Sequence, residues 1–193
     1  MAIPKRSKQN SLWLTWFLNQ EIGLYMVKVD LHYIQDAFNT FGLDEHCEFY
    51  QMAYKEITNS PMGLLTDTEA DLYAEQLYGL IHARFILTEA GISLMIDKYN
   101  EVFDKCPRYL CYNTTALPIG LNSSIGVDTT QLFCPSCKDI FKPPRDSALN
   151  KIDGAYFGPN FPHMFLMANP KLIPVVRQEK FIGKLFGFKI KYK

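Results

Sequence analysis

Four cysteines in two close pairs constrain the fold of this chain more than any other feature. Cys106 and Cys111 enclose four residues, Cys134 and Cys137 enclose two, and 22 residues separate the two pairs. Each pair can place both sulfurs on one side of a tight turn, and the spacer is long enough to carry strands and return the chain. The pattern therefore predicts one Zn2+ bound by four thiolates. Because no coordination position stays open, the ion is expected to be structural.

Two disulfides or four unrelated buried thiols are the alternatives to a metal site. The tight Cys-Pro turns and the lack of any mark of secretion argue against them. The opening residues, MAIPKRSKQNSLWLTWF, contain only a short apolar stretch without a small-residue cleavage site, and no apolar run approaches the ~20 residues of a membrane span. We therefore expect a reducing compartment and no membrane, and we expect the fifth cysteine, Cys47, to pack on a helix.

Four helices are predicted in the N-terminal half from apolar spacing and capping residues. They cover residues 31–41 between the cap Asp30 and Gly42, residues 45–57, residues 72–87 after a Thr66–Glu69 capping box, and a segment that starts at Thr88 and ends before Cys106. The apolar residues of the third helix occupy more than one face. This predicts that the third helix is central to the core.

The sequence after Cys106 consists of short β-prone pieces between prolines and glycines. They are YLCYN (109–113), ALPIG (116–120), QLFC (131–134) and DIFKP (139–143), as expected for a zinc ribbon. Residues 153–167, DGAYFGPNFPHMFLM, are too irregular for a long helix and too apolar for a free linker, so we expect them to dock on the helical core. His163 in this stretch is expected to pack or to hydrogen-bond, because the four cysteines already complete the metal site.

The last residues of the chain alternate strictly in character. One face carries Phe186, Phe188, Ile190 and Tyr192, and the other carries Gly187, Lys189, Lys191 and Lys193, which predicts a strand or a hairpin. The predicted fold class is thus α+β, with an N-terminal all-helical domain (1–104), a four-cysteine zinc ribbon (105–160) and an extended C-terminal segment (161–193).

The net charge of zero conceals a strong asymmetry between two parts of the chain. Residues 44–104 hold 12 acidic and 3 basic side chains, whereas residues 138–193 hold 4 acidic and 11 basic ones. A nucleic-acid-binding zinc ribbon is the alternative function. Residues 104–146, however, hold five basic and four acidic side chains, so the ribbon lacks the excess of positive charge that nucleic-acid binding needs. A zinc hydrolase would need a histidine or carboxylate ligand and an open position. The motifs of a protein kinase are also missing from the sequence, so kinase activity is not expected.

Several motifs, in order along the chain, resemble the regulatory beta subunit of the protein kinase casein kinase II. They are WF (16–17), YIQDAFN (33–39), LYGLIHARFILTEAGI (77–92), CPRYLC (106–111), LPIGL (117–121), CPSC (134–137), DGAYFG (153–158), FPHM (161–164) and LFGFKI (185–190). The resemblance implies a non-catalytic subunit that dimerises through its zinc ribbon, carries one structural Zn2+ per chain, and binds two catalytic alpha subunits in an alpha2beta2 heterotetramer. It also implies effects on holoenzyme stability, activity and choice of protein substrates, in the cytoplasm and nucleus.

The resemblance assigns two sets of interface residues. Pro107, Tyr109, Ile140 and Phe141 would form the dimer interface, and Leu185, Phe186, Phe188 and Ile190 would bind the catalytic subunit. The chain departs from the family in three places: Ser7 lies in a basic segment, residues 57–71 hold only three carboxylates, and Phe186 stands where tyrosine is common. The resemblance therefore does not carry over N-terminal autophosphorylation, polyamine regulation or a tail hydroxyl contact.

Overall fold

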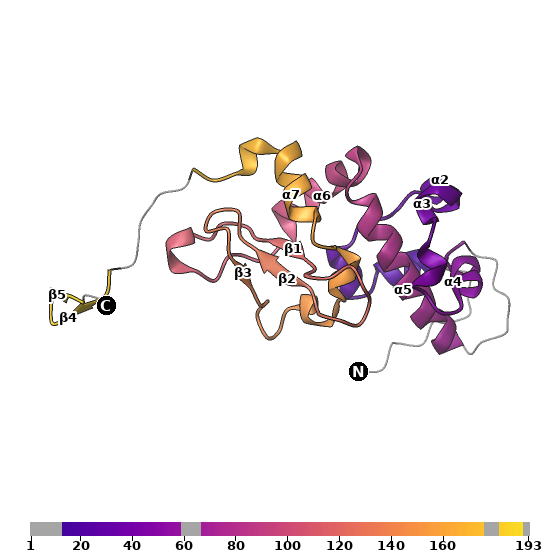
Figure 1. The fold of residues 1–193 in the computed structure, drawn as a ribbon, viewed down its shortest axis with the longest axis horizontal. Helices are drawn as coiled ribbons and strands as arrows, with labels where there is room; N and C mark the ends of the chain where they lie inside the picture. Colours follow the sequence, from indigo (N-terminus) through magenta and orange to yellow (C-terminus); the bar gives the residue numbers. More distant parts are fainter. Residues whose placement is uncertain (1–12, 59–66, 176–181, 191–193) are drawn as a thin grey trace.

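The computed structural model describes residues 13–58, 67–175 and 182–190, and it combines helices with small antiparallel sheets (Figure 1). The helices are α1 (Trp13–Leu18), α2 (Leu31–Gln35), α3 (Ala37–Thr40), α4 (Tyr50–Ile57), α5 (Asp67–Phe85), α6 (Glu89–Glu101) and α7 (Phe161–Ala168). Short 3-10 helices are η1 (Ile22–Tyr25), η2 (Leu43–Glu45), η3 (Tyr109–Cys111), η4 (Ala148–Lys151), η5 (Gly154–Tyr156) and η6 (Pro170–Leu172). The predicted α+β class is confirmed.

Helix α5 is the centre of the helical part, as its apolar faces predict. Its side chains at Leu77, Tyr78 and Ile81 are fully buried, and α4 packs along it. Near the N-terminus of α5, the indole Nε1 of Trp13 donates a 2.9 Å hydrogen bond to Asp71 Oδ1, which connects α1 to α5. Burial of the large aromatic side chains of Trp13 and Tyr78 supplies much of the apolar stabilisation of this region.

Two polar side chains on one face of α5 hold segments that are distant in sequence. The Tyr78 hydroxyl donates to Val27 O (2.8 Å) and accepts from Val29 N–H (3.0 Å). One turn later, His82 Nε2 accepts from Val27 N–H (3.2 Å), while Nδ1 lies 2.8 Å from Tyr156 O. These bonds satisfy buried backbone groups, and they tie the N-terminal segment to the part of the chain that follows the sheet.

Helix α5 ends where the predicted cap of α6 begins. Thr88 Oγ1 accepts from Gly91 N–H at 3.1 Å and its hydroxyl also contacts Phe85 O at 2.7 Å, so one side chain serves the end of one helix and the start of the next. The two helices meet at a bend of 102°. Among the described residues no single helix is long and apolar enough to cross a membrane, although this bent pair passes the test by length and composition.

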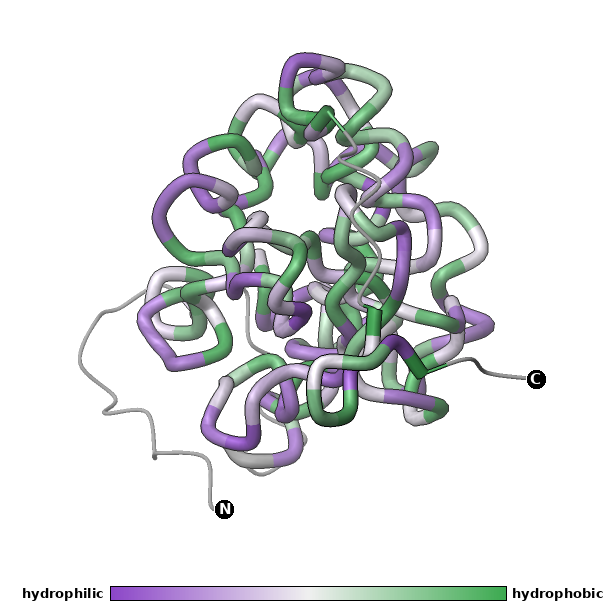
Figure 2. The backbone as a smooth tube through the Cα atoms, turned by 90° about the vertical axis from the view of Figure 1, so that its left-hand side faces the viewer, coloured by the Kyte–Doolittle hydropathy of each residue, from purple (hydrophilic) through white to green (hydrophobic). Residues whose placement is uncertain are grey.

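The sheet has the order β1-β2-β3, with β1 (Leu117–Ile119), β2 (Gln131–Phe133) and β3 (Ile140–Phe141) all antiparallel. Helix α7 packs against β1, and η5 packs against α5. The buried residues of β1 and β2 join those of the helices in one continuous core. Hydrophobic and hydrophilic residues alternate over short distances along the backbone, as elements with one buried face require (Figure 2).

A glycine in α5 permits the closest of these contacts. A Cβ at Gly79 would lie 2.1 Å from Cδ1 of Tyr156, so only glycine lets the Tyr156 ring lie directly on the helix. Tyr156, Phe157, Phe161 and Phe165 are all buried in the core. This confirms that residues 153–167 dock on the helical part, and it adds a helix, α7, that their glycine- and proline-rich sequence did not suggest.

The predicted helix over residues 31–41 is wrong as a single element. The chain leaves helical geometry at Asp36 (φ −75°, ψ 115°), whose carboxylate caps α3 by accepting from Phe38 N–H at 2.9 Å. Of the four apolar residues on the predicted face, only Ile34 is buried, while Leu31, Phe38 and Phe41 are exposed. A local aspartate cap therefore competes successfully with helix continuation.

The other corrections are also local. Helix α4 begins at Tyr50 because Phe49 adopts a left-handed conformation (φ 55°), and Cys47 lies buried in a bend and not on a helix. Residues 109–113 form η3 and a turn instead of a strand. His163 is exposed, and its ring meets the edge of Phe133 with centroids 5.2 Å apart. The capping residue Thr66 and Tyr192 lie outside the described residues.

Candidate metal centre and neighbouring surfaces

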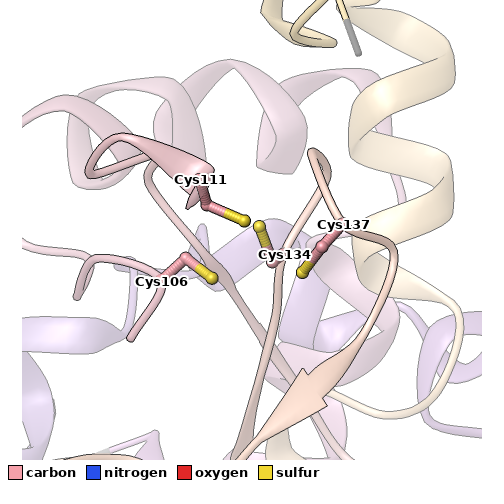
Figure 3. Close-up of side chains that lie close together, drawn as sticks. All are labelled: Cys106, Cys111, Cys134 and Cys137. Carbon is pink, nitrogen blue, oxygen red and sulfur yellow. The ribbon is translucent and has the colours of Figure 1, made fainter. Parts of the chain in front are cut away.

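The structure brings all four predicted ligands together. The Sγ atoms of Cys106, Cys111, Cys134 and Cys137 lie within 4.8 Å of one another and point towards a common centre (Figure 3). Three of the four side chains are buried, and Cys137 is half-buried. None of the five cysteines is in a disulfide. This arrangement can hold a metal ion, whereas the paired sulfurs of two disulfides would not share one centre.

Two tight turns, here called the knuckles, position the sulfurs: residues 105–115 and residues 134–141. In each knuckle the residue after the second cysteine is left-handed, with Tyr112 at φ 49° and Lys138 at φ 58°. Backbone bonds close the turns, from Cys111 N–H to Arg108 O (2.9 Å) and from Lys138 N–H to Cys134 O (2.8 Å). The left-handed residues reverse the chain directly behind each pair, which keeps both sulfurs on the same side.

Backbone N–H groups also point at the sulfurs. Arg108 N–H donates to Cys106 Sγ at 3.5 Å. Burial raises the pKa of Cys106 and of Cys134, although N–H groups of Cys137 and Ser136 oppose the shift at Cys134. Burial also acts to raise the pKa of Cys137, but the hydrogen bond from Asp139 N–H and those with the other thiols lower it overall. Four clustered thiols, three of which accept hydrogen bonds from backbone N–H groups, are suited to become thiolates when a cation replaces their protons.

The exterior of the knuckles exposes apolar side chains. Tyr109 is 90% exposed, and Pro107 and Ile140 are exposed as well. Phe141 is different because it is half-buried and packs against both the cysteine cluster and the main core. Thus three of the four residues assigned to a dimer interface by resemblance are free on the surface, and the fourth supports the knuckle from within.

The C-terminal residues form a hairpin of β4 (Lys184–Leu185) and β5 (Phe188–Lys189), joined by Phe186 and Gly187. Both turn residues are left-handed (φ 49° and 86°), as a two-residue hairpin turn of type I′ requires. Leu185 pairs with Phe188 across the strands and Phe186 lies in the turn, so the prediction of one face carrying residues 186, 188 and 190 is wrong and the hairpin alternative is correct. Leu185, Phe186, Phe188 and Ile190 are all exposed, with Phe186 at 93% and Phe188 at 80%.

Sequence reasoning missed several exposed apolar residues. Tyr112, Leu121 and Val127 lie on the surface of the ribbon, and Phe38 and Phe41 lie on that of the helical part. Leu121 and Val127 flank a polar, glycine-containing segment, which could have indicated an exposed loop. No sequence signal distinguishes Phe38 and Phe41 from core residues, because their spacing is helical.

Comparison with known proteins identifies the family. The family model described as casein kinase II regulatory subunit matches residues 12–189. The casein kinase II subunit beta' of Drosophila melanogaster is 43% identical over 185 residues, which cover 93% of this chain and 84% of the relative. The beta subunit of Dictyostelium discoideum is 41% identical, with 92% and 68% covered, and the beta' subunit of Saccharomyces cerevisiae is 37% identical, with 95% and 74% covered.

These relatives are named as beta subunits, and the family is that of the regulatory subunits, so the chain is not a kinase catalytic subunit. Membership in this family implies association with the catalytic subunit of the same kinase. With its motifs, its α+β fold and its four clustered cysteines, the chain belongs to the casein kinase II regulatory subunit family.

Proposed function

We propose that this chain joins two catalytic subunits of casein kinase II into an alpha2beta2 complex. In this proposal a Zn2+ shapes the knuckles, the knuckles form a homodimer interface, and the C-terminal hairpin binds the catalytic subunit. Assembly would then change the stability, activity and protein-substrate choice of the holoenzyme, in the cytoplasm and nucleus. The observation that carries the proposal is that both the knuckles and the hairpin expose apolar side chains, among them Tyr109, Phe186 and Phe188, in a chain of this family.

A zinc ion fits the cysteine site. A tetrahedral Zn2+ with Zn–S bonds of about 2.3 Å separates its sulfurs by about 3.8 Å. The four Sγ atoms already lie within 4.8 Å, so only a small contraction would seat the ion. When bound, zinc would supply four strong bonds across the two knuckles and no catalytic position.

Support for dimerisation comes from the poor packing of the knuckle exterior. Tyr109 and Ile140 project from a region whose own cluster consists of the cysteines with Phe141. Such exposed apolar residues are typical of the centre of a homodimer interface, where aromatic side chains are enriched. The three-part division at residues 104 and 160 stays a prediction, because the sheet and the helices share one core.

Support for catalytic-subunit binding comes from the hairpin. An isolated two-stranded hairpin is marginally stable in water, and this one exposes four apolar side chains. A partner that covers Phe186 and Phe188 would both bury these rings and stabilise the turn. The lysines at 184 and 189 would contribute mainly to association rate and to salt dependence.

Sedimentation of the purified chain with a casein kinase II catalytic subunit tests the assembly. We expect a complex of two regulatory and two catalytic chains, and a Tyr109→Asp/Ile140→Asp variant should sediment as a monomer that still binds one catalytic subunit. Replacement of the exposed pair should leave the core intact because neither side chain is buried. Dimers of unchanged affinity in this variant would place the interface elsewhere.

A further inference from the structure

Phe38 and Phe41 form an exposed aromatic pair that neither the metal site nor the hairpin explains. Their side chains are 84% and 81% exposed, although their helical spacing predicts that they are buried. They lie three residues apart at α3 and its C-terminal cap, so they share one side of this short element. Together with the carboxylates of Asp36, Asp44 and Glu45, we call this surface the α3 patch.

The patch is held in place by specific polar contacts. Arg84 Nη1, from α5, donates to both Asn39 O and Phe41 O at 2.9 Å. Asn39 Nδ2 donates to Tyr33 O at 3.1 Å, and Asp36 caps the start of α3. These bonds fix the backbone on both sides of the two rings. The exposure of Phe38 and Phe41 therefore results from a backbone that hydrogen bonds hold in place, and not from fraying of a helix end.

The surroundings of the two rings are acidic. Residues 30–54 contain five carboxylates, at Asp30, Asp36, Asp44, Glu45 and Glu48, and all five side chains are exposed. The same residues contain no lysine or arginine. The nearest described arginine, Arg84, is half-buried and its Nη1 is directed at backbone carbonyls. A ligand that approaches the rings thus meets an excess of negative charge.

We propose that the α3 patch is a docking site for a short basic segment of a partner protein, with aromatic or aliphatic side chains that cover Phe38 and Phe41 and with lysine or arginine beside the carboxylates. The rings supply the apolar contact, since exposed aromatic pairs are the kind of residue that anchors interfaces. The carboxylates select for basic partners and accelerate their association. The site is independent of the proposed zinc, dimer and hairpin functions.

Fluorescence anisotropy with the full chain tests the docking site. The probe is a short labelled peptide in which lysine alternates with leucine and phenylalanine, and the control peptide has glutamate in place of lysine. We expect the lysine peptide to bind the wild type and the glutamate peptide not to bind. The Phe38→Ser/Phe41→Ser variant should bind the lysine peptide at least about tenfold more weakly than the wild type does. Asp36→Asn/Asp44→Asn/Glu45→Gln should reduce both the affinity and its dependence on salt.

A matched control is available on another surface. Met167 and Val175 are also largely exposed, and residues 160–175 contain no carboxylate side chain, so Met167→Ser/Val175→Ser should bind the lysine peptide like the wild type. Equal affinity for the wild type and Phe38→Ser/Phe41→Ser, or an equal loss in the control variant, would overturn the proposal. Self-association that only Phe38→Ser/Phe41→Ser abolishes would make the occupant a second copy and would overturn the assignment to a partner protein.

Discussion

The knuckles and the α5 core use different means to reach a fixed structure. Around the knuckles the buried cluster consists of Cys106, Cys111 and Cys134, with Cys137 and Phe141 packed against it. Around α5, large side chains such as Trp13, Phe17 and Tyr78 are fully enclosed, and their rings stack or meet edge to face. Because the first region buries little apolar surface, we expect it to depend on a bound metal, whereas the second is stabilised by burial of apolar surface.

The boundary between the two regions runs through the ribbon. Strands β1 and β2 carry Leu117, Ile119 and Leu132 into the main core, so they belong energetically with the helices. The turns that hold the cysteines lie outside this core, and Phe141 packs against both clusters. Loss of metal should therefore release the knuckles, including β3, while β1 and β2 stay in the main core.

The largest expected effect is the loss of a metal ligand. Cys134→Ser should lower metal content well below one ion per chain, because structural zinc sites carry an apparent binding free energy on the order of 10 kcal/mol. Hydrogen exchange should become fast in residues 105–115 and 134–141 and stay slow in α5. Elemental analysis and exchange mass spectrometry measure the two effects.

Cys47→Ser is the matched control, since Cys47 is buried but is not a member of the four-cysteine cluster. It should keep one zinc per chain and slow exchange in both knuckles. Should Cys134→Ser retain a full equivalent of zinc, or should α5 lose its protection together with the knuckles, the distinction between the two regions would fail.

The next effect concerns pH and the polar contacts of α5. Complete burial lowers the pKa of His82 to about 4, and the neutral ring fits its site because Nδ1–H faces Tyr156 O while Nε2 accepts from Val27 N–H. Burial raises the pKa of Glu75 to about 7, against a hydrogen bond from Tyr156. Below pH 6.5 His82 is protonated more readily in the unfolded state than in the folded state, so it lowers the free energy of unfolding as pH falls. Glu75 is protonated more readily in the folded state, so it raises the free energy of unfolding as pH falls.

Glu75→Gln separates the two groups. In this variant the free energy of unfolding should fall by roughly 3 kcal/mol between pH 6.5 and pH 4, because His82 no longer has an opposing partner. The wild type should lose clearly less over the same range. Urea unfolding at each pH measures both curves, and a wild type that is as pH-sensitive as Glu75→Gln would refute the assignment.

The smallest expected effect is a loss of stability when the helix cap at the α5–α6 bend is removed. Thr88→Ala removes the cap of α6 and should cost about 1 kcal/mol, whereas Thr88→Ser keeps the hydroxyl and should cost little. Thermal unfolding of the two variants gives the difference. Equal losses would mean that the methyl group of Thr88, and not its hydroxyl, stabilises the bend.

Sequence reasoning succeeded where the determining groups are close together along the chain. The cysteine spacing predicted the cluster because each knuckle is a local turn, and Thr88 predicted the start of α6 because a cap lies within one turn of its acceptor. The periodicity of α5 also predicted its central place, since a helix with apolar residues on several faces must be covered on several sides.

It failed where distant groups decide the outcome. The C-terminal end of α3 is held by Arg84, whose Nη1 donates to the carbonyl of Phe41, 43 residues away in sequence. His82 connects Val27 with Tyr156, and no pattern in the sequence pairs these three residues. At the tail, strict alternation predicted a strand or a hairpin, and the left-handed turn at Phe186 and Gly187 decides for the hairpin.

Calorimetric titration of the catalytic subunit into the zinc-loaded chain tests most directly that this chain joins two catalytic subunits. We predict one catalytic subunit bound per regulatory chain. In the Phe186→Ala/Phe188→Ala variant we predict affinity at least about 30-fold weaker with the dimer intact, since each truncated aromatic anchor commonly costs at least ~2 kcal/mol. Wild-type affinity in that variant would contradict the account, because the exposed rings of the hairpin would then have no part in binding.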